Sequence, residues 1–197
     1  MGKGPMNIHV IIDHPYVKSF NYAVLNAFRN GINDKKHTID ILDLNADQFN
    51  PIMSPNELQG YTKGLTIDPK VEEYQSRLLR SEHLVMVFPI WWMVMPSRLK
   101  GWMDKILLPG FAFTEDENPQ PLLTHIHSAT IFTTTAVPDK THRSEFNNAL
   151  HWVLCKGTLS FVGIQDIKWF NFGETGVATK EKHDEWLKFV KDFAAKL

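Results

Sequence analysis

Apolar residues along this chain gather in five short runs that are rich in β-branched and aromatic residues. The runs cover residues 7–13, 37–44, 83–88, 129–134 and 167–172. Short continuous runs of this kind predict strands, and they are typical of strands buried in a parallel sheet. Between them, apolar residues spaced three or four apart predict helices over 20–30, 69–81, 96–106, 144–156 and from 179 onward.

Local signals agree with these helix limits. Ser19 is a favourable N-cap, and Gly31 is a favourable stop for the helix that follows it. Pro69 and Pro96 stand where helices begin, and Thr179 precedes the last one. Two stretches rich in loop-forming residues, 45–69 and 108–123, are expected to be long excursions, the first with one helical turn.

Strict alternation of strands and helices predicts an α/β fold with a parallel sheet and helices on both faces. Five strands favour a flavodoxin-like order, with ligands bound at the carboxyl ends of the strands where the order reverses. A length of 197 residues favours one domain, with residues 1–6 as an extension.

Composition excludes several classes of function. A net charge of −1 offers no basic surface for nucleic acid. The longest apolar run, 84–96, is too short for a membrane helix and contains prolines, and residues 1–5 lack the apolar core of a signal peptide. The single cysteine, Cys155, fits a reducing compartment and predicts a cytoplasmic protein.

The corner that follows the third predicted strand is the strongest indication of a ligand. Trp91 and Trp92 come directly after the strand and before the helix that Pro96 opens. Large flat rings at the carboxyl edge of a sheet suit a planar aromatic cofactor. The alternative is an aromatic plug in the core or between subunits.

The loop after the first strand lacks both a dinucleotide-binding glycine motif and a P-loop. It still opens a helix, so free N–H groups there can hold an anion, with Ser19 and His14 adding donors. The alternative is a plain N-cap beside a loop histidine. No metal site is expected, because His125 and His127 share one strand face without a third ligand, and Cys155 is expected to be a packed thiol.

Several motifs, taken in order, resemble the NAD(P)H:quinone oxidoreductase family, which includes DT-diaphorase and the modulator of drug activity B. The resemblance covers residues 7 to 135, and its most specific part is 89–102. Its motifs are His14-Pro15 with Ser19-Phe20-Asn21, Asp43-Leu44, Phe49-Asn50-Pro51, Phe88-Pro89-Ile90-Trp91-Trp92, Pro96-Ser97-Arg98-Leu99-Lys100-Gly101-Trp102, Gly110-Phe111-Ala112-Phe113 and Phe132-Thr133-Thr134-Thr135.

The resemblance implies a flavodoxin-like fold, a bound flavin and two-electron reduction of quinones, or of nitro- or azo-aromatics, by NAD(P)H in ping-pong fashion. It also implies a homodimer with the active site near the subunit interface. By the same resemblance, the residues that hold the flavin phosphate and ribityl chain are His14, Ser19, Phe20 and Asn21. Those that border the ring system are Pro89, Ile90, Trp91, Trp92 and Met93, with Thr133, Thr134 and Thr135 under its pyrimidine side.

The chain departs from the family after the fourth predicted strand. The family's Thr-Thr-Gly-Gly is replaced by 133–138, and no tyrosine follows in 139–143. His142 or Arg143 is therefore a candidate for stabilising negative charge on a reduced flavin. The alternative is that both residues are exposed in a loop.

Three questions stay open at this level. FAD is favoured because 45–69 is long enough to cover an adenine, with FMN as the alternative, and no basic cluster selects NADPH over NADH. A regulatory flavoprotein that docks on a potassium-efflux system through exposed apolar surface around 107–113 is a second possible function. A flavodoxin-like electron carrier is a third, which a net charge of −1 disfavours.

Overall fold

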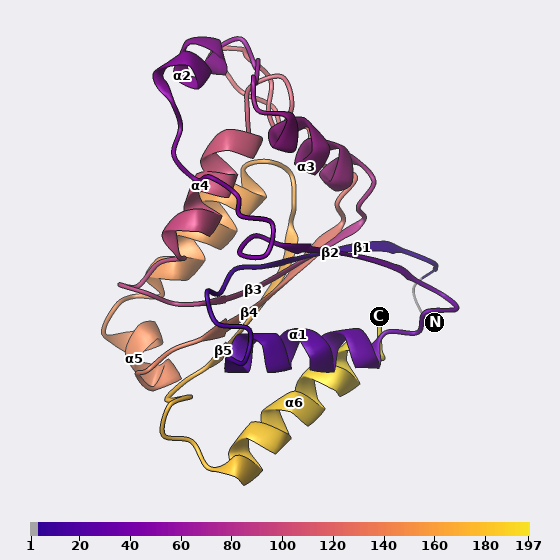
Figure 1. The fold of residues 1–197 in the computed structure, drawn as a ribbon, viewed down its shortest axis with the longest axis vertical. Helices are drawn as coiled ribbons and strands as arrows, with labels where there is room; N and C mark the ends of the chain where they lie inside the picture. The colour runs from indigo at the N-terminus through magenta and orange to yellow at the C-terminus, as the bar shows by residue number, and fades with distance from the viewer. Residues whose placement is uncertain (1–3) are drawn as a thin grey trace.

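A five-stranded parallel sheet runs through the centre of the molecule (Figure 1). The computed structural model describes residues 4–197 and has the strand order β2-β1-β3-β4-β5. The strands are β1 (Asn7–Ile12), β2 (Thr38–Asp43), β3 (His83–Pro89), β4 (Ser128–Thr134) and β5 (Asp166–Phe172). The helices are α1 (Phe20–Gly31), α2 (Pro55–Tyr61), α3 (Pro69–Leu79), α4 (Ser97–Ile106), α5 (Asp139–Ser144), the π-helix η1 (His151–Ser160) and α6 (Lys180–Ala194).

The strand order is the flavodoxin-like one, so the predicted fold class is confirmed. The chain leaves β1 in one direction to form β2 and then crosses back to form β3, β4 and β5, which makes β1 and β3 the point of reversal. Ile12 is level with Val87, and Pro89 is level with Thr134. This register brings the carboxyl ends of the three central strands to one edge.

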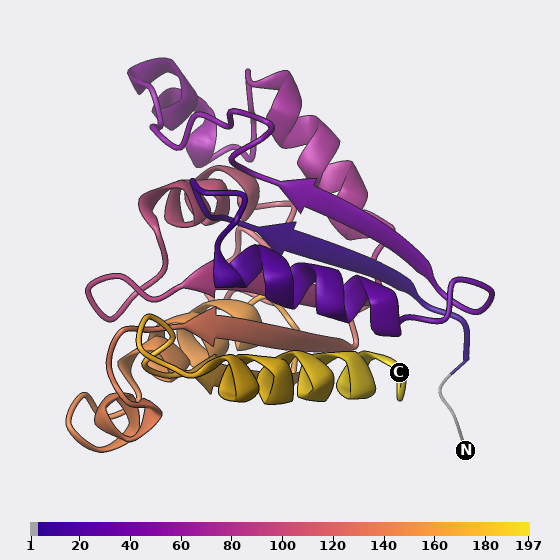
Figure 2. The same ribbon diagram turned by 60° about the horizontal axis from the view of Figure 1, so that its bottom comes forward.

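Helices cover both faces of the sheet, as predicted. On one face α1 and α6 lie side by side, visible in Figures 1 and 2 as the indigo and yellow helices. Phe28 and Val190 pack there against Val10 and Val85 of the strands. The other face is covered by α3, α4 and η1, whose buried side chains pack against Met86. Each central strand is therefore apolar on both sides, which explains its continuous apolar run.

The predicted excursion 45–69 holds more helix than a single turn. Ser54 caps α2 through the backbone N–H of Glu57, and the Glu57 carboxylate accepts from the Ser54 backbone in return. Lys105 on α4 is buried, and its Nζ lies 2.7 Å from Glu57 and 2.8 Å from Asp68. These ion pairs raise the pKa of Lys105 although burial acts against them. One buried cation thus ties α2 and the start of α3 to α4.

The predicted helix over 144–156 is wrong in its limits. The structure has α5 before it and η1 from His151 to Ser160, separated by Asn147 and Asn148, which both have positive φ. Asparagine tolerates this left-handed conformation, which ends one helix before the next begins. Of the predicted extension, residues 1–3 lie outside the described residues.

Candidate functional site

Three segments meet at the carboxyl edge of the sheet, beside the point where the strand order reverses. They are the loop from β1 to α1, the turn after β3 and the end of β4. The backbone N–H of Ile90 donates to the carbonyl of Thr134 at 2.8 Å, which extends the pairing of β3 and β4 beyond the strands. The edge is therefore a continuous surface built from segments far apart in the sequence.

The start of α1 has an unused hydroxyl. Ser19 is the N-cap with extended backbone, yet its side chain makes no capping hydrogen bond. Its Oγ is buried and has no partner. The helix runs for 12 residues and has no acidic side chain in its first turn. A helix N-terminus with a free hydroxyl suits an anion such as a phosphate, and the plain N-cap reading does not account for the unused Oγ.

His14 lies in the loop that leads to this helix. Its Nδ1 accepts from the backbone N–H of Tyr16 at 3.0 Å, so the neutral ring carries its proton on Nε2. Burial lowers the pKa of His14, which keeps the ring neutral at pH 7. The imidazole is 6.3 Å from the ring of Trp91. His14 can therefore offer a neutral N–H donor next to an aromatic surface.

Asn21, the second residue of α1, also has an unsatisfied group. The Thr134 hydroxyl donates to Asn21 Oδ1 at 2.9 Å, and both side chains are buried. Asn21 Nδ2 has no partner. Buried donors are rarely left unpaired, because each lost hydrogen bond costs about 1–3 kcal/mol. Together with Ser19 Oγ, this amide is an orphaned donor at the edge, and an oxygen-rich ligand would satisfy both.

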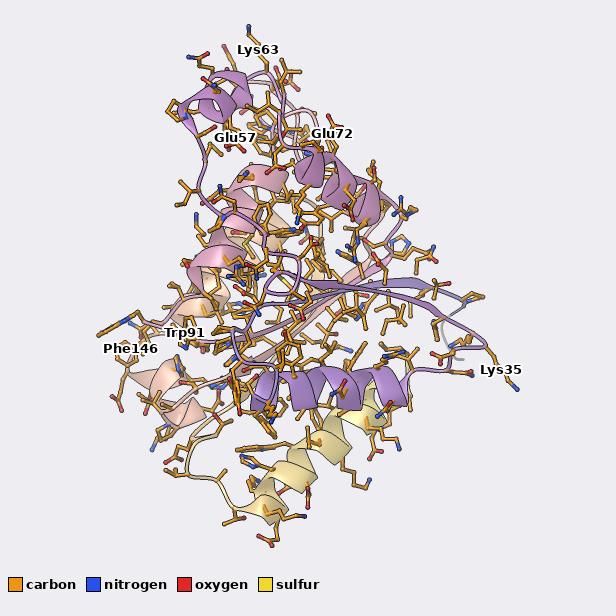
Figure 3. The ribbon with its side chains drawn as sticks, in the orientation of Figure 1. Lys35, Glu57, Lys63, Glu72, Trp91 and Phe146 are labelled. Atoms are coloured by element: carbon orange, nitrogen blue, oxygen red, sulfur yellow. The ribbon has the colours of Figure 1, made fainter. Side chains whose placement is uncertain are left out.

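The two tryptophans belong to a tight turn. The backbones of Trp91 and Val94 exchange hydrogen bonds of 2.9 and 3.1 Å, and the residues between them, Trp92 and Met93, both have positive φ. This is the pattern of a two-residue hairpin turn. Trp91 is 46% exposed and Trp92 is 95% exposed, so neither is an aromatic plug within the subunit. Figure 3 places Trp91 at the same side of the molecule as Phe146.

The residues just before this turn form its base. Pro89 and Ile90 are buried, and Phe20 at the start of α1 is half-buried. Phe20 stacks on His183 of α6 with ring centroids 4.5 Å apart. His183 lies outside residues 7–135, the part of the chain that resembles the family, so the sequence motifs did not predict this contact.

His142 is buried, which overturns the alternative that it is an exposed loop residue. It lies in α5, and its Nε2 is 3.0 Å from the hydroxyl of Thr135. Burial lowers the pKa of His142, with Asp139 acting against the shift and Arg143 adding to it. The structure thus brings His142 to the end of β4, whereas Arg143 is exposed.

The three threonines at the end of β4 differ in what their hydroxyls contact. Thr134 bonds Asn21 and Thr135 bonds His142, as described above. The hydroxyl of Thr133 accepts from Trp169 Nε1 at 2.8 Å and donates to Asn171 Oδ1 at 2.9 Å. Thr133 is fully buried, and these two bonds occupy its hydroxyl.

Asp13, at the end of β1, was missed by sequence reasoning. Its Oδ2 accepts from the backbone N–H of Leu99 at 3.0 Å, and Arg98 lies 3.9 Å from its Oδ1. Burial raises the pKa of Asp13 in spite of these partners. It takes the place of the missing side-chain cap of α4. The signal available in the sequence was an acidic residue ending an apolar strand.

Other candidates do not reach this edge. His125 and His127 lie in the turn before β4, not on a strand, and His125 is hydrogen-bonded to the carbonyl of Leu78. Cys155 is a buried free thiol, as predicted, and burial raises its pKa to about 11. Within residues 4–197, no three His, Cys, Asp or Glu side chains gather as a set of metal ligands. Over the same residues, no helix combines the length and apolarity that a bilayer crossing needs.

The fold and the carboxyl edge of the sheet together define a doubly wound α/β protein. Its unpaired buried donors, Ser19 Oγ and Asn21 Nδ2, lie near the point where the strand order reverses. A family model described as flavodoxin-like fold matches residues 6–197. An NAD(P)H oxidoreductase of Haemophilus influenzae is 30% identical over 171 residues, which cover 86% of this chain and 84% of the relative. The NAD(P)H dehydrogenase (quinone) 1 of Rattus norvegicus is 29% identical over 122 residues, 53% of this chain and 44% of that protein.

Among solved structures, the NAD(P)H:quinone oxidoreductase of Methanothermobacter marburgensis superposes with a TM-score of 0.89 at 22% identity, covering 97% of this chain and 98% of that one. The chain belongs to the flavodoxin-like fold family, and it is an oxidoreductase. The resemblance drawn from the motifs is thereby confirmed.

Proposed function

We propose that this protein is a flavin-dependent NAD(P)H oxidoreductase that reduces quinones or related nitro- and azo-aromatic acceptors by two electrons. The observation that carries the proposal is the pair of orphaned buried donors, Ser19 Oγ and Asn21 Nδ2, at the sheet edge that also carries the half-exposed ring of Trp91. A flavin offers phosphate oxygens, ribityl hydroxyls and a flat ring in one molecule. The names of the relatives support the same function.

The residues present fit such a cofactor. The N–H groups at the start of α1, with Ser19 Oγ, would hold the phosphate, and Asn21 Nδ2 and His14 Nε2 would donate to oxygens of the cofactor. Trp91 and the adjacent, buried Ile90 would border the ring and exclude water from one side. Phe20, Pro89, Trp92 and Met93 remain proposed as cofactor-binding residues on the strength of the motif alone.

The chemistry that a bound flavin supplies is hydride uptake from NAD(P)H followed by delivery of two electrons to the acceptor. The chain itself needs no strong acid or base for this, and it offers oriented donors in a partly dry site. His142, neutral and buried next to Thr135, is proposed as the residue that faces the negative charge of the reduced cofactor. Thr134 is proposed to orient the Asn21 amide toward the cofactor through its hydrogen bond to Asn21 Oδ1.

The identity of the flavin belongs to the proposal too. We favour FAD, with FMN as the alternative, because α2 and its flanking loops form an ordered structure over 45–69 that could cover an adenine. Mass measurement of the extracted cofactor decides between them. NADH and NADPH are both retained as reductants.

A homodimer and a cytoplasmic location complete the proposal. The segment 107–113 does not supply the exposed apolar surface expected of it, because its apolar residues are buried or half-buried. Exposed apolar side chains on and beside η1 include Phe146, Trp152, Val153 and Phe161. This surface is the proposed subunit contact, and light scattering of the purified protein tests it. The location is proposed from the single buried cysteine.

The function is tested by anaerobic titration of the purified, flavin-loaded protein with NADPH or NADH, followed by a quinone. We expect the flavin absorbance to bleach and then to return. A protein that binds flavin but scarcely oxidises either nucleotide would favour the regulatory alternative. A folded protein that binds neither FMN nor FAD would refute the proposal.

A further inference from the structure

Five side chains at the carboxyl end of β4 and β5 form a closed ring of contacts. Trp169 Nε1 donates to Thr133, and Thr133 donates to Asn171, as described above. Asn171 Nδ2 then donates to Asp139 Oδ1 at 3.1 Å. Arg143 Nε donates to Asp139 Oδ2 at 2.6 Å, and its guanidinium lies 5.2 Å from the centroid of the Trp169 ring, which closes the ring.

The ring joins three elements, because Thr133 is on β4, Trp169 and Asn171 are on β5, and Asp139 and Arg143 are on α5. Figures 1 and 2 show α5 projecting beyond the ends of the strands, away from the larger helices. It has six residues and no side-chain cap. A helix this short is not stable by itself, so its position depends on what holds it.

The turn after β5 contacts the start of α5. A Cβ on Gly173 would lie 2.6 Å from the backbone nitrogen of Asp139 and 2.9 Å from the carbonyl oxygen of Val137. The backbone N–H of Glu174 donates to that same carbonyl at 3.2 Å. The close approach that glycine permits therefore lets β5 hold the start of α5.

We propose that this ring positions α5, and through it His142, at the cofactor edge, and that Thr133 serves the site as a ring member and does not touch the cofactor. The proposal has two halves: the ring holds α5 in place, which is the positioning half, and α5 places His142 at the cofactor, which is the catalytic half. The catalytic half rests on the proposed function. The ion pair of Asp139 and Arg143 would contribute little as an isolated surface pair. Its partners Thr133 and Asn171 are buried or half-buried, so the ring is anchored on the sheet.

Hydrogen exchange of the purified protein tests the positioning half without any turnover. Thr133→Val removes both hydrogen bonds of the Thr133 hydroxyl, and Arg143→Gln removes the guanidinium that contacts Asp139 and Trp169. We expect the amides of 137–149 to exchange about 10-fold faster in both variants, since the segment opens more often. Lys180→Gln is the matched control, because Lys180 makes an exposed i,i+4 pair of 2.6 Å with Asp184 on α6.

The midpoint potential of the bound flavin tests the catalytic half. We expect Arg143→Gln to shift the potential in the same direction as His142→Ala, with the double variant no different from His142→Ala alone. Unchanged exchange in both ring variants would overturn the proposal, and so would faster exchange with an unaltered potential. If the wild-type protein binds no flavin, the proposed function fails, whereas the exchange data still decide whether the ring holds α5.

Discussion

Two serines at helix N-termini give a direct test of the proposed cofactor site, because only one of them caps its helix through its side chain. Ser54 Oγ accepts from the backbone N–H of Glu57 at 3.2 Å, while Ser19 Oγ has no partner in the protein. Replacing each by alanine removes the same atom from a comparable position. Ser54→Ala should therefore lose stability and keep flavin binding, whereas Ser19→Ala should lose flavin binding and keep stability.

The magnitudes follow from these contacts. Ser54→Ala loses a cap, which costs about 1 kcal/mol and should lower the melting temperature by about 2–4 °C in a chain of this size. Ser19→Ala loses no bond in the free protein and should melt within about 1 °C of wild type. A hydrogen bond to a charged phosphate contributes about 1.5–3 kcal/mol, so Ser19→Ala should weaken flavin binding by about 10- to 150-fold.

The assay is fluorescence titration of FMN and FAD into the two variants, with thermal melts of the flavin-free proteins alongside. Ser54→Ala should bind both flavins as wild type does. The reasoning is refuted if Ser19→Ala binds them with unchanged affinity, or if Ser19→Ala melts several degrees lower with no flavin present.

Three further predictions follow from the structure. Replacing Lys105 by Met should destabilise the fold by about 1.5–3 kcal/mol, because the half-buried carboxylates of Glu57 and Asp68 would lose the buried cation that pairs with them, and a wild-type urea midpoint would contradict this. Burial lowers the pKa of His142 from its ordinary 6.5, so the unfolded chain binds the proton more readily and stability should fall as pH drops below about 6.5. Melts of His142→Gln between pH 5 and 8 should show a flatter profile, and an unchanged profile would count against it. Gly101→Ala should lower the melting temperature in spite of its better helix propensity, because the new Cβ would overlap the backbone of the loop that precedes α2, and an equal or higher melting temperature would rule this out.

Most of the fold could be predicted from the sequence, because each strand of a sheet covered on both faces is a continuous apolar run. The helices predicted over 20–30, 69–81, 96–106 and from 179 onward agree with the structure to within a few residues, and Ser19 and Thr179 stand at the predicted N-cap positions. The region between β4 and β5 was less predictable. Its helix break depends on two left-handed asparagines, and asparagine is common enough in helices and loops that the sequence does not mark the break.

The candidate site was predictable only in part. Motif and loop position pointed to Ser19 and Asn21, but their unsatisfied atoms become visible only in three dimensions. The contacts of Thr133 with Trp169 and Asn171 join positions 36 and 38 residues apart, and nothing in one sequence pairs such positions. The burial of His142 likewise follows from where β5 holds α5.

The hairpin turn at Trp92 has a consequence for anyone engineering this protein. A bulky residue with a φ of 50° is strained, and an indole that is 95% exposed gains nothing from packing within the subunit. Glycine would adopt that conformation without penalty. Thermostability screens on the isolated protein would therefore select against this tryptophan, and would remove the aromatic surface that the turn presents to solvent.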